Sequence, residues 1–108
     1  MSLSTHVLDA ATGRPAAGIR VRMESHENGA WVTMAEAATD ADGRIREFTE
    51  AGPRAGMHRL VFDTAGYFDG TPSFYPEVAV TFQVTDSAEH HHVPLLLSPF
   101  AYSTYRGS

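Results

Sequence analysis

Residues 19–34 read IRVRMESHENGAWVTM, and this stretch shows what kind of secondary structure builds the chain. Ile19, Val21 and Met23 alternate with charged side chains, which is the period of two expected of a strand with one buried face. Asn28-Gly29 separates this run from a second strand-like run, and both turn residues tolerate positive φ angles. The stretch therefore predicts two antiparallel strands joined by a tight hairpin turn.

The same period of two extends over most of the chain. Val78, Val80, Phe82 and Val84 alternate with small or polar residues, and turn signals such as Asp42-Gly43 separate the apolar runs. We expect a short helix at residues 64–68. We expect strands at residues 4–9, 19–26, 31–37, 44–49, 57–63, 78–84, 91–97 and 101–106.

Short strands separated by Gly, Pro and Asn turns are typical of an all-β sandwich. The 108 residues suit a single domain, residues 1–108, with one hydrophobic core. No apolar run approaches the roughly 20 residues that cross a bilayer, so we expect no membrane partner. A strand-like segment begins almost at the first residue, so we expect no secretory leader and a cytoplasmic location.

Composition excludes several kinds of site. The chain has no cysteine, hence no thiol nucleophile and no thiolate metal ligand, and all eight basic residues are arginine. Without lysine it can neither form a Schiff base with a pyridoxal cofactor nor use a phosphate-loop lysine. The net charge of −5 argues against a nucleic-acid partner, because such proteins need a basic face to neutralise phosphates.

One expected strand breaks the alternation. Leu95, Leu96 and Leu97 are consecutive, so apolar side chains leave both faces of the sheet. One face can serve the core, and a second subunit is the simplest cover for the other. The alternative is a central strand covered by a long loop of its own chain.

Three histidines precede this leucine run. His90 and His92 share one face of the expected strand, and His91 takes the opposite face. Histidines at i and i+2 can bind zinc or copper, although no His-Glu-x-x-His spacing accompanies them. A solvated strand start without function is the second interpretation, and general acid–base chemistry near neutral pH is the third. The residues alone leave all three interpretations open.

The last residues, 102–108, contain strand-forming Tyr and Thr and are expected to pair in a sheet almost to the end. Such pairing would hold Arg106 and Ser108 in fixed positions. Arg44, after the Asp42-Gly43 turn, is a second arginine of interest, since guanidinium groups suit planar, oxygen-rich or anionic ligands. An edge strand with polar ends and an ordinary surface arginine are the plain alternatives.

Four segments resemble the 5-hydroxyisourate hydrolases, the transthyretin-related proteins of purine catabolism. They are STHVLD at 4–9 with TGRPA at 12–16, then residues 39–44, FYPE at 74–77, and residues 90–108. The resemblance implies a transthyretin-like sandwich of two four-stranded sheets, assembled as a homotetramer with active sites at the dimer–dimer interface. It implies hydrolysis of the substrate 5-hydroxyisourate to 2-oxo-4-hydroxy-4-carboxy-5-ureidoimidazoline, without a metal or organic cofactor.

The resemblance also implies which residues form the site. The family's catalytic histidine in the first strand corresponds to His6, its arginine after Asp-Gly to Arg44, and its histidine before Val-Pro-Leu-Leu to His92. In this reading the two histidines position and activate water, while Arg44 stabilises developing negative charge. The sequence does not decide which histidine is the base.

The family's terminal motif corresponds to the end of this chain and is expected to complete the catalytic and substrate-binding pocket. The corresponding residues are Tyr105, Arg106, Gly107 and Ser108. One local departure is His91, where the family commonly has tyrosine. Because its side chain is expected to point away from His92, we expect the difference to affect only the packing of that face.

Two rival functions remain. A transthyretin-like carrier would bind a small ligand without chemistry on the same fold, because a fold does not fix a function. Such a carrier of hydrophobic aromatic ligands needs neither the pocket histidines nor the polar terminal motif. A metal-binding module on His90 and His92 would instead purify with stoichiometric metal.

Overall fold

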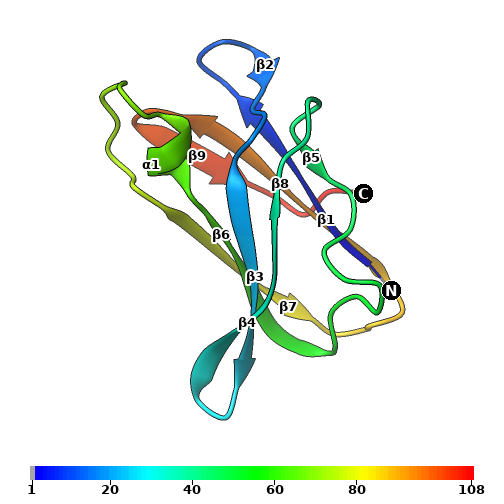
Figure 1. Ribbon diagram of the computed structural model, residues 1–108. Coiled ribbons are helices and arrows are strands. Elements are labelled where there is room, and N and C mark those ends of the chain that lie inside the picture. Colours follow the sequence, from blue (N-terminus) through cyan, green and yellow to red (C-terminus); the bar gives the residue numbers. More distant parts are fainter. Residues whose placement is uncertain (1) are drawn as a thin grey trace.

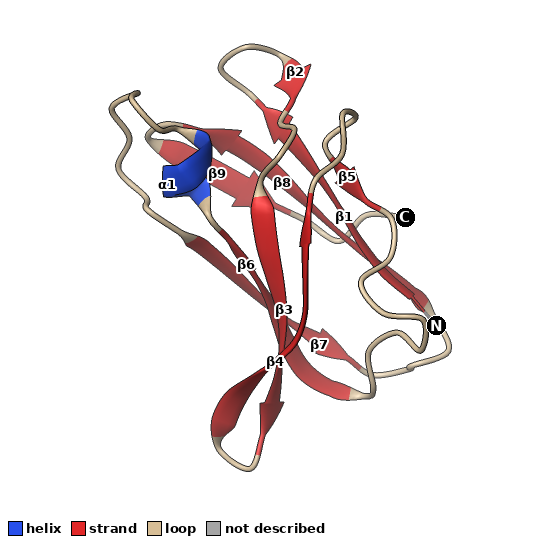
Figure 2. Ribbon diagram, in the orientation of Figure 1, coloured by secondary structure: helices blue, strands red, loops and turns tan. Residues whose placement is uncertain are grey.

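The computed structural model describes residues 2–108 and contains two β-sheets packed face to face (Figure 1). The first sheet contains β1 (Ser2–Asp9), β2 (Arg14–Pro15), β5 (Arg44–Ile45), β8 (His90–Ser98) and β9 (Ala101–Thr104). The second sheet contains β3 (Arg20–Glu27), β4 (Ala30–Ala38), β6 (Gly56–Phe62) and β7 (Val78–Val84). The helix, α1, is Thr64–Tyr67 (Figure 2). The expected all-β sandwich with one short helix is confirmed.

Alternation along the strands builds the core between the sheets. Val21, Leu60 and Phe62 of the second sheet are at most 1% exposed, as are Val7 and Leu95 of the first. These side chains belong to one cluster of buried residues, so the two sheets share a single core. The β3–β4 hairpin turns at Asn28-Gly29, both at positive φ as its sequence predicts.

Strands β1 and β8 pair in parallel, so the N-terminal strand lies beside a strand from the C-terminal part of the chain. Ser4 lies opposite His92, and His6 lies opposite Pro94. The buried Thr5 hydroxyl donates a hydrogen bond of 2.6 Å to the carbonyl of Val93 across the same pair. This pairing brings the histidine of β1 close to the histidines of β8.

Three strand predictions need correction. The strand expected over 44–49 ends at Ile45, because the chain leaves the sheet and Phe48 packs against the core. The strand expected over 101–106 ends at Thr104, and after it only one isolated bridge joins Gly107 to His92. Arg14–Pro15, read from sequence as part of a turn, adds a short strand beside β1, so the first sheet has five strands.

Candidate active site

Three residues singled out from sequence share the outer face of the first sheet. His6 of β1 lies directly opposite Arg44 of β5 in antiparallel register. His92 of β8 pairs with Ser4, two residues from His6 on β1, so its side chain leaves the same face as His6. All three side chains are half-buried. Three separate strands therefore deliver two imidazoles and one guanidinium to one patch.

A tight turn fixes Arg44 beside β1. The Asp40 carboxylate accepts backbone hydrogen bonds from Asp42 (2.8 Å) and Arg44 (3.0 Å). The bond from Arg44 is the main cause of the lowered pKa of Asp40. Gly43 has φ +75°, and a Cβ there would lie 2.5 Å from the carbonyl oxygen of Val7. Only glycine fits this approach, so the Asp-Gly signal sets where Arg44 meets the strand.

The end of the chain closes over His92. The backbone N–H of Gly107 donates a 2.8 Å hydrogen bond to the carbonyl of His92. A Cβ on Gly107 would lie 2.3 Å from Cδ2 of the His92 ring and 3.2 Å from Cγ of Pro94. The terminal segment therefore passes the imidazole at a distance that only glycine permits. Ser108 is the next residue in the chain.

His92 is held by a hydrogen bond and electrostatically tuned. The hydroxyl of Ser4, which is 8% exposed, lies 2.7 Å from Nδ1 of His92. Burial, followed by the positive charge of Arg44, lowers the pKa of His92 below its ordinary value of 6.5. The imidazole is therefore mostly neutral at pH 7 and can accept a proton.

Sequence reasoning missed the partners of His92 on β1. The Ser4 hydroxyl also lies 3.1 Å from Nε2 of His90, and Nδ1 of His90 is hydrogen-bonded to the Ser2 hydroxyl. The rings of His90 and His92 are stacked, with centroids 6.4 Å apart. The available signal was the spacing of Ser2, Ser4 and His6, which places three polar side chains on one face of the first strand.

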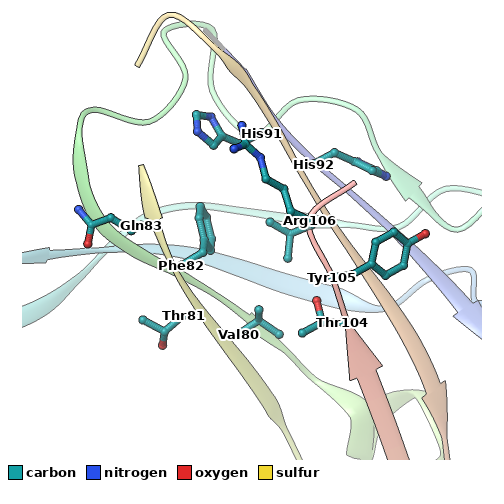
Figure 3. A pocket seen from close by; sticks show the side chains of 10 residues that line it. Val80, Thr81, Phe82, Gln83, His91, His92, Thr104, Tyr105 and Arg106 are labelled. Carbon is teal, nitrogen blue, oxygen red and sulfur yellow. The ribbon is translucent and has the colours of Figure 1, made fainter. Parts of the chain in front are cut away.

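His91 points to the other side of β8, as the alternation predicts (Figure 3). It is 5% exposed, and desolvation lowers its pKa. It lines a cavity of about 260 Å³ between the edges of the two sheets, together with Phe82 and Arg106. His92 and Tyr105 also contribute to the wall of this cavity, whereas His6 and Arg44 do not.

The terminal motif divides between the two sides of β8. The Tyr105 ring is 59% exposed and lies on the His92 side, whereas the Arg106 side chain runs towards His91 (Figure 3). The Arg106 guanidinium lies 3.7 Å from the carboxylate of Glu89. Within one chain, the structure therefore brings together His6, Arg44, His92 and Gly107, and it directs Arg106 elsewhere.

Within residues 2–108, no group of three or more His, Asp or Glu side chains is arranged to hold a metal ion. His90 and His92, the pair considered as metal ligands, each have a nitrogen within hydrogen-bonding distance of Ser4. No helix among the same residues is long and apolar enough to cross a membrane.

The sequence profile of the HIUase/Transthyretin family matches residues 3–107, nearly the whole chain. The chain belongs to this family. The 5-hydroxyisourate hydrolase of Salmonella typhimurium is 43% identical over 109 residues, which cover 98% of this chain and 80% of the relative. The resemblance that the sequence motifs indicated is thereby confirmed.

Solved structures of family members have the same fold. The 5-hydroxyisourate hydrolase of Klebsiella pneumoniae superposes with a TM-score of 0.88 and 38% identity, covering 100% of both chains. Sea bream transthyretin, solved in complex with thyroxine, superposes with a TM-score of 0.91 and 33% identity, covering 99% of this chain and 95% of the relative. The family thus includes both an enzyme and a hormone-binding protein on one fold, so the function must be inferred from the site.

Proposed function

We propose that the protein hydrolyses 5-hydroxyisourate to 2-oxo-4-hydroxy-4-carboxy-5-ureidoimidazoline in urate catabolism. The observation that carries the proposal is the grouping of His6, Arg44 and His92 on one sheet face, with Gly107 packed against His92. The similarity to 5-hydroxyisourate hydrolases over nearly the whole chain supports the same activity. A hydrophobic carrier site would have no use for this set of bases and donors.

His92 is the best candidate for the general base. Its lowered pKa keeps it neutral near pH 7, and Ser4 fixes its ring through Nδ1, which leaves Nε2 for the substrate side. In the first step Nε2 takes a proton from water, and the water oxygen bonds to a ring carbonyl carbon. In the second step the carbon–nitrogen bond of the ring breaks, and the same proton passes to the departing nitrogen.

Arg44 and His6 act on the other atoms of the reaction. The carbonyl oxygen gains negative charge as water adds, and the guanidinium of Arg44 can donate two parallel hydrogen bonds to such an oxygen or to a ring edge. We assign the orientation of the attacking water to His6, which lies opposite Arg44 on β1. No metal or organic cofactor enters these steps.

The terminal motif bounds the substrate pocket on the His92 side. Gly107 gives the backbone its close approach to the ring, and we assign substrate contact to Tyr105 and Ser108, its neighbours in the terminal motif. Arg106, which the resemblance assigns to substrate binding, lies 3.7 Å from the carboxylate of Glu89 in the single chain. We assign to Arg106 the role of holding the terminal segment in place in the single chain. Its contact with substrate would form in the homotetramer.

A homotetramer completes the site. The His6 face is open in one chain, and Leu96 and Leu8, opposite each other in the β1–β8 register, are half-buried on that same face. A face with both apolar and catalytic side chains is suited to pairing with a second copy that covers the leucines and walls the substrate in. The active sites then lie between dimers, as the sequence resemblance implies.

Freshly generated 5-hydroxyisourate provides the test, because its ultraviolet absorbance falls as the ring opens. Protein treated with a chelator should accelerate this decay over the spontaneous rate to the same extent as untreated protein. No acceleration by either preparation would contradict the hydrolase function and would favour a carrier. Acceleration lost on chelation and restored by metal would contradict the mechanism through His92.

A further inference from the structure

Two histidines share the hydroxyl of Ser4, and this shared hydroxyl couples their protonation. Ser4 Oγ lies 2.7 Å from Nδ1 of His92 and 3.1 Å from Nε2 of His90. A serine hydroxyl has one proton to donate, so it donates to one imidazole and accepts from the other. Ser2 binds the remaining nitrogen of His90, so both nitrogens of that ring have partners.

We propose that His90 is a positioning residue that sets the tautomer of His92 through Ser4 and receives the proton that His92 takes from water. The proposal rests on the hydrolase function above, since it concerns the base of that reaction. The two ring nitrogens of His90 contact the hydroxyls of Ser2 and Ser4 on β1.

Two arrangements of the hydrogen bonds are possible when both histidines are neutral. In the first, Ser4 donates to Nε2 of His90 and accepts from Nδ1–H of His92, which leaves a lone pair on Nε2 of His92. In the second, every bond is reversed, and Nε2 of His92 carries a proton. The proposal requires the first arrangement at neutral pH, because only it leaves Nε2 of His92 able to take a proton from water.

A proton on His90 favours the second arrangement. Cationic His90 donates from both nitrogens, so Ser4 accepts from it and uses its own proton on Nδ1 of His92, the other partner of its hydroxyl. His92 then carries its own proton on Nε2 and cannot act as a base. The state of an exposed histidine thus determines whether the half-buried histidine is a base or an acid.

The same path moves the proton during turnover. When Nε2 of His92 takes a proton from water, the Nδ1 proton passes to Ser4 Oγ and the Ser4 proton passes to Nε2 of His90. The chain of His92, Ser4 and His90 gains one proton and one positive charge. That charge lies on the exposed His90 and not on His92, where Arg44 would repel it. The path reverses when Nε2 of His92 gives its proton to the departing ring nitrogen.

The charged and titratable groups around the pair come from several elements. Arg44 on β5, His6 on β1 and His90 on the same strand act on His92. Glu89, next to His90 in the chain, pairs with Arg106. Because a first proton has two places in the pair and only one on His92 alone, the pair binds a proton more readily than His92 by itself.

The test compares His90→Phe, His90→Gln and Ser4→Ala with the wild-type protein, and His26→Phe is the matched control. His26 is an exposed histidine at the distant β3–β4 hairpin. Each of the three site variants should lower kcat by about 10- to 100-fold, the range known for removing a hydrogen-bond partner that orients a metal-bound histidine. Each should also move the acid limb of the pH–kcat/KM profile to lower pH, because only protonation of His92 itself then removes the base. His26→Phe should change neither quantity.

The glutamine variant separates proton transfer from simple hydrogen bonding, because an amide can bond to Ser4 but cannot receive a proton. Full activity of His90→Gln, or unchanged kcat and pH profile in His90→Phe, would overturn the proposal.

Long-range ¹H–¹⁵N spectra without substrate provide a readout independent of activity. On acidification wild-type His92 should change from the Nδ1–H to the Nε2–H tautomer, and in His90→Phe it should not. Wild-type protein that lacks activity but shows this change would refute the hydrolase function alone, whereas the absence of the change would refute the coupling.

Discussion

The backbone of Gly107 lies against the imidazole of His92, and the Gly107 N–H donates a 2.8 Å hydrogen bond to the backbone carbonyl of His92. The ring and the terminal segment leave no room for a side chain at Gly107, where a Cβ would come within 2.3 Å of the ring. The position of the terminal segment and that of His92 therefore depend on each other.

Gly107→Ala should lower kcat by about 10²-fold or more, because either His92 must turn or the terminal segment must lift, and both disturb acid–base geometry. Thermal unfolding should change little, since only one isolated bridge is lost. Turnover and melting temperature measured on the same preparation check both statements. An alanine variant with wild-type turnover would show that the terminal segment does not set the position of His92.

Opposite orientation on β8 predicts different effects for neighbouring histidines. His92→Asn should lower kcat by about 10²–10⁴-fold, the usual contribution of a general acid–base group. His91→Asn should retain most activity but lower the free energy of unfolding by about 1–3 kcal/mol, because His91 is buried between the sheets. Equal losses of activity in the two variants would refute the assignment of His91 to packing.

Leu96→Glu should break the assembly and the activity together. A carboxylate at this half-buried position on the His6 face would have to be buried unpaired against a second copy. Light scattering should show a species smaller than the tetramer, with little turnover and an unchanged β-sheet circular dichroism spectrum. Val32→Glu, a matched change at an exposed apolar residue of the second sheet, should keep both mass and turnover. A fully active Leu96→Glu monomer would contradict a site shared between subunits.

Glu24 should affect stability without affecting catalysis. Its carboxylate is nearly buried in the second sheet and pairs with Arg59 (2.6 Å) and Arg22 (3.1 Å). Burial acts to raise its pKa, but the two arginines outweigh burial and lower the pKa below its ordinary value of 4.5. Glu24→Gln should therefore cost about 1–3 kcal/mol of unfolding free energy at pH 7.

The pH dependence follows from the lowered pKa of Glu24. Its stabilisation is complete above pH 4.5 and is lost as the pH falls through its folded-state pKa. The difference between wild type and Glu24→Gln in urea unfolding should shrink over that range, with equal turnover at pH 7. A difference that grew on acidification would contradict the ion-pair assignment.

Local sequence patterns predicted most of the fold because strand periodicity and turn residues act over short distances. The Asn28-Gly29 hairpin and the alternating run at 78–84 appear as expected. The strand expected over 44–49 is shorter in the structure, because Phe48 packs against the core. This is a tertiary contact that period-two patterns do not contain. The parallel pairing of β1 with β8 joins segments more than eighty residues apart, and no local signal reports it.

The same limit applied to the site. Alternation correctly separated His91 from His92, and the resemblance directed attention to His6 and Arg44. The spacing of Ser2 and Ser4 puts their side chains on the face of His6, but the sequence does not predict their partners. Only the β1–β8 register places these hydroxyls beside His90 and His92. Arg106 pairs with Glu89, a contact that a terminal motif alone does not specify.

Decay of 5-hydroxyisourate in large molar excess over the protein tests the central claim most directly, because it distinguishes turnover from binding. The account predicts complete conversion at an initial rate proportional to protein concentration, at many substrate molecules per chain. A hormone-carrier type of site would bind at most a stoichiometric amount and leave the rest to decay spontaneously. Spontaneous-rate decay of the excess substrate, at every protein concentration, would contradict the hydrolase function.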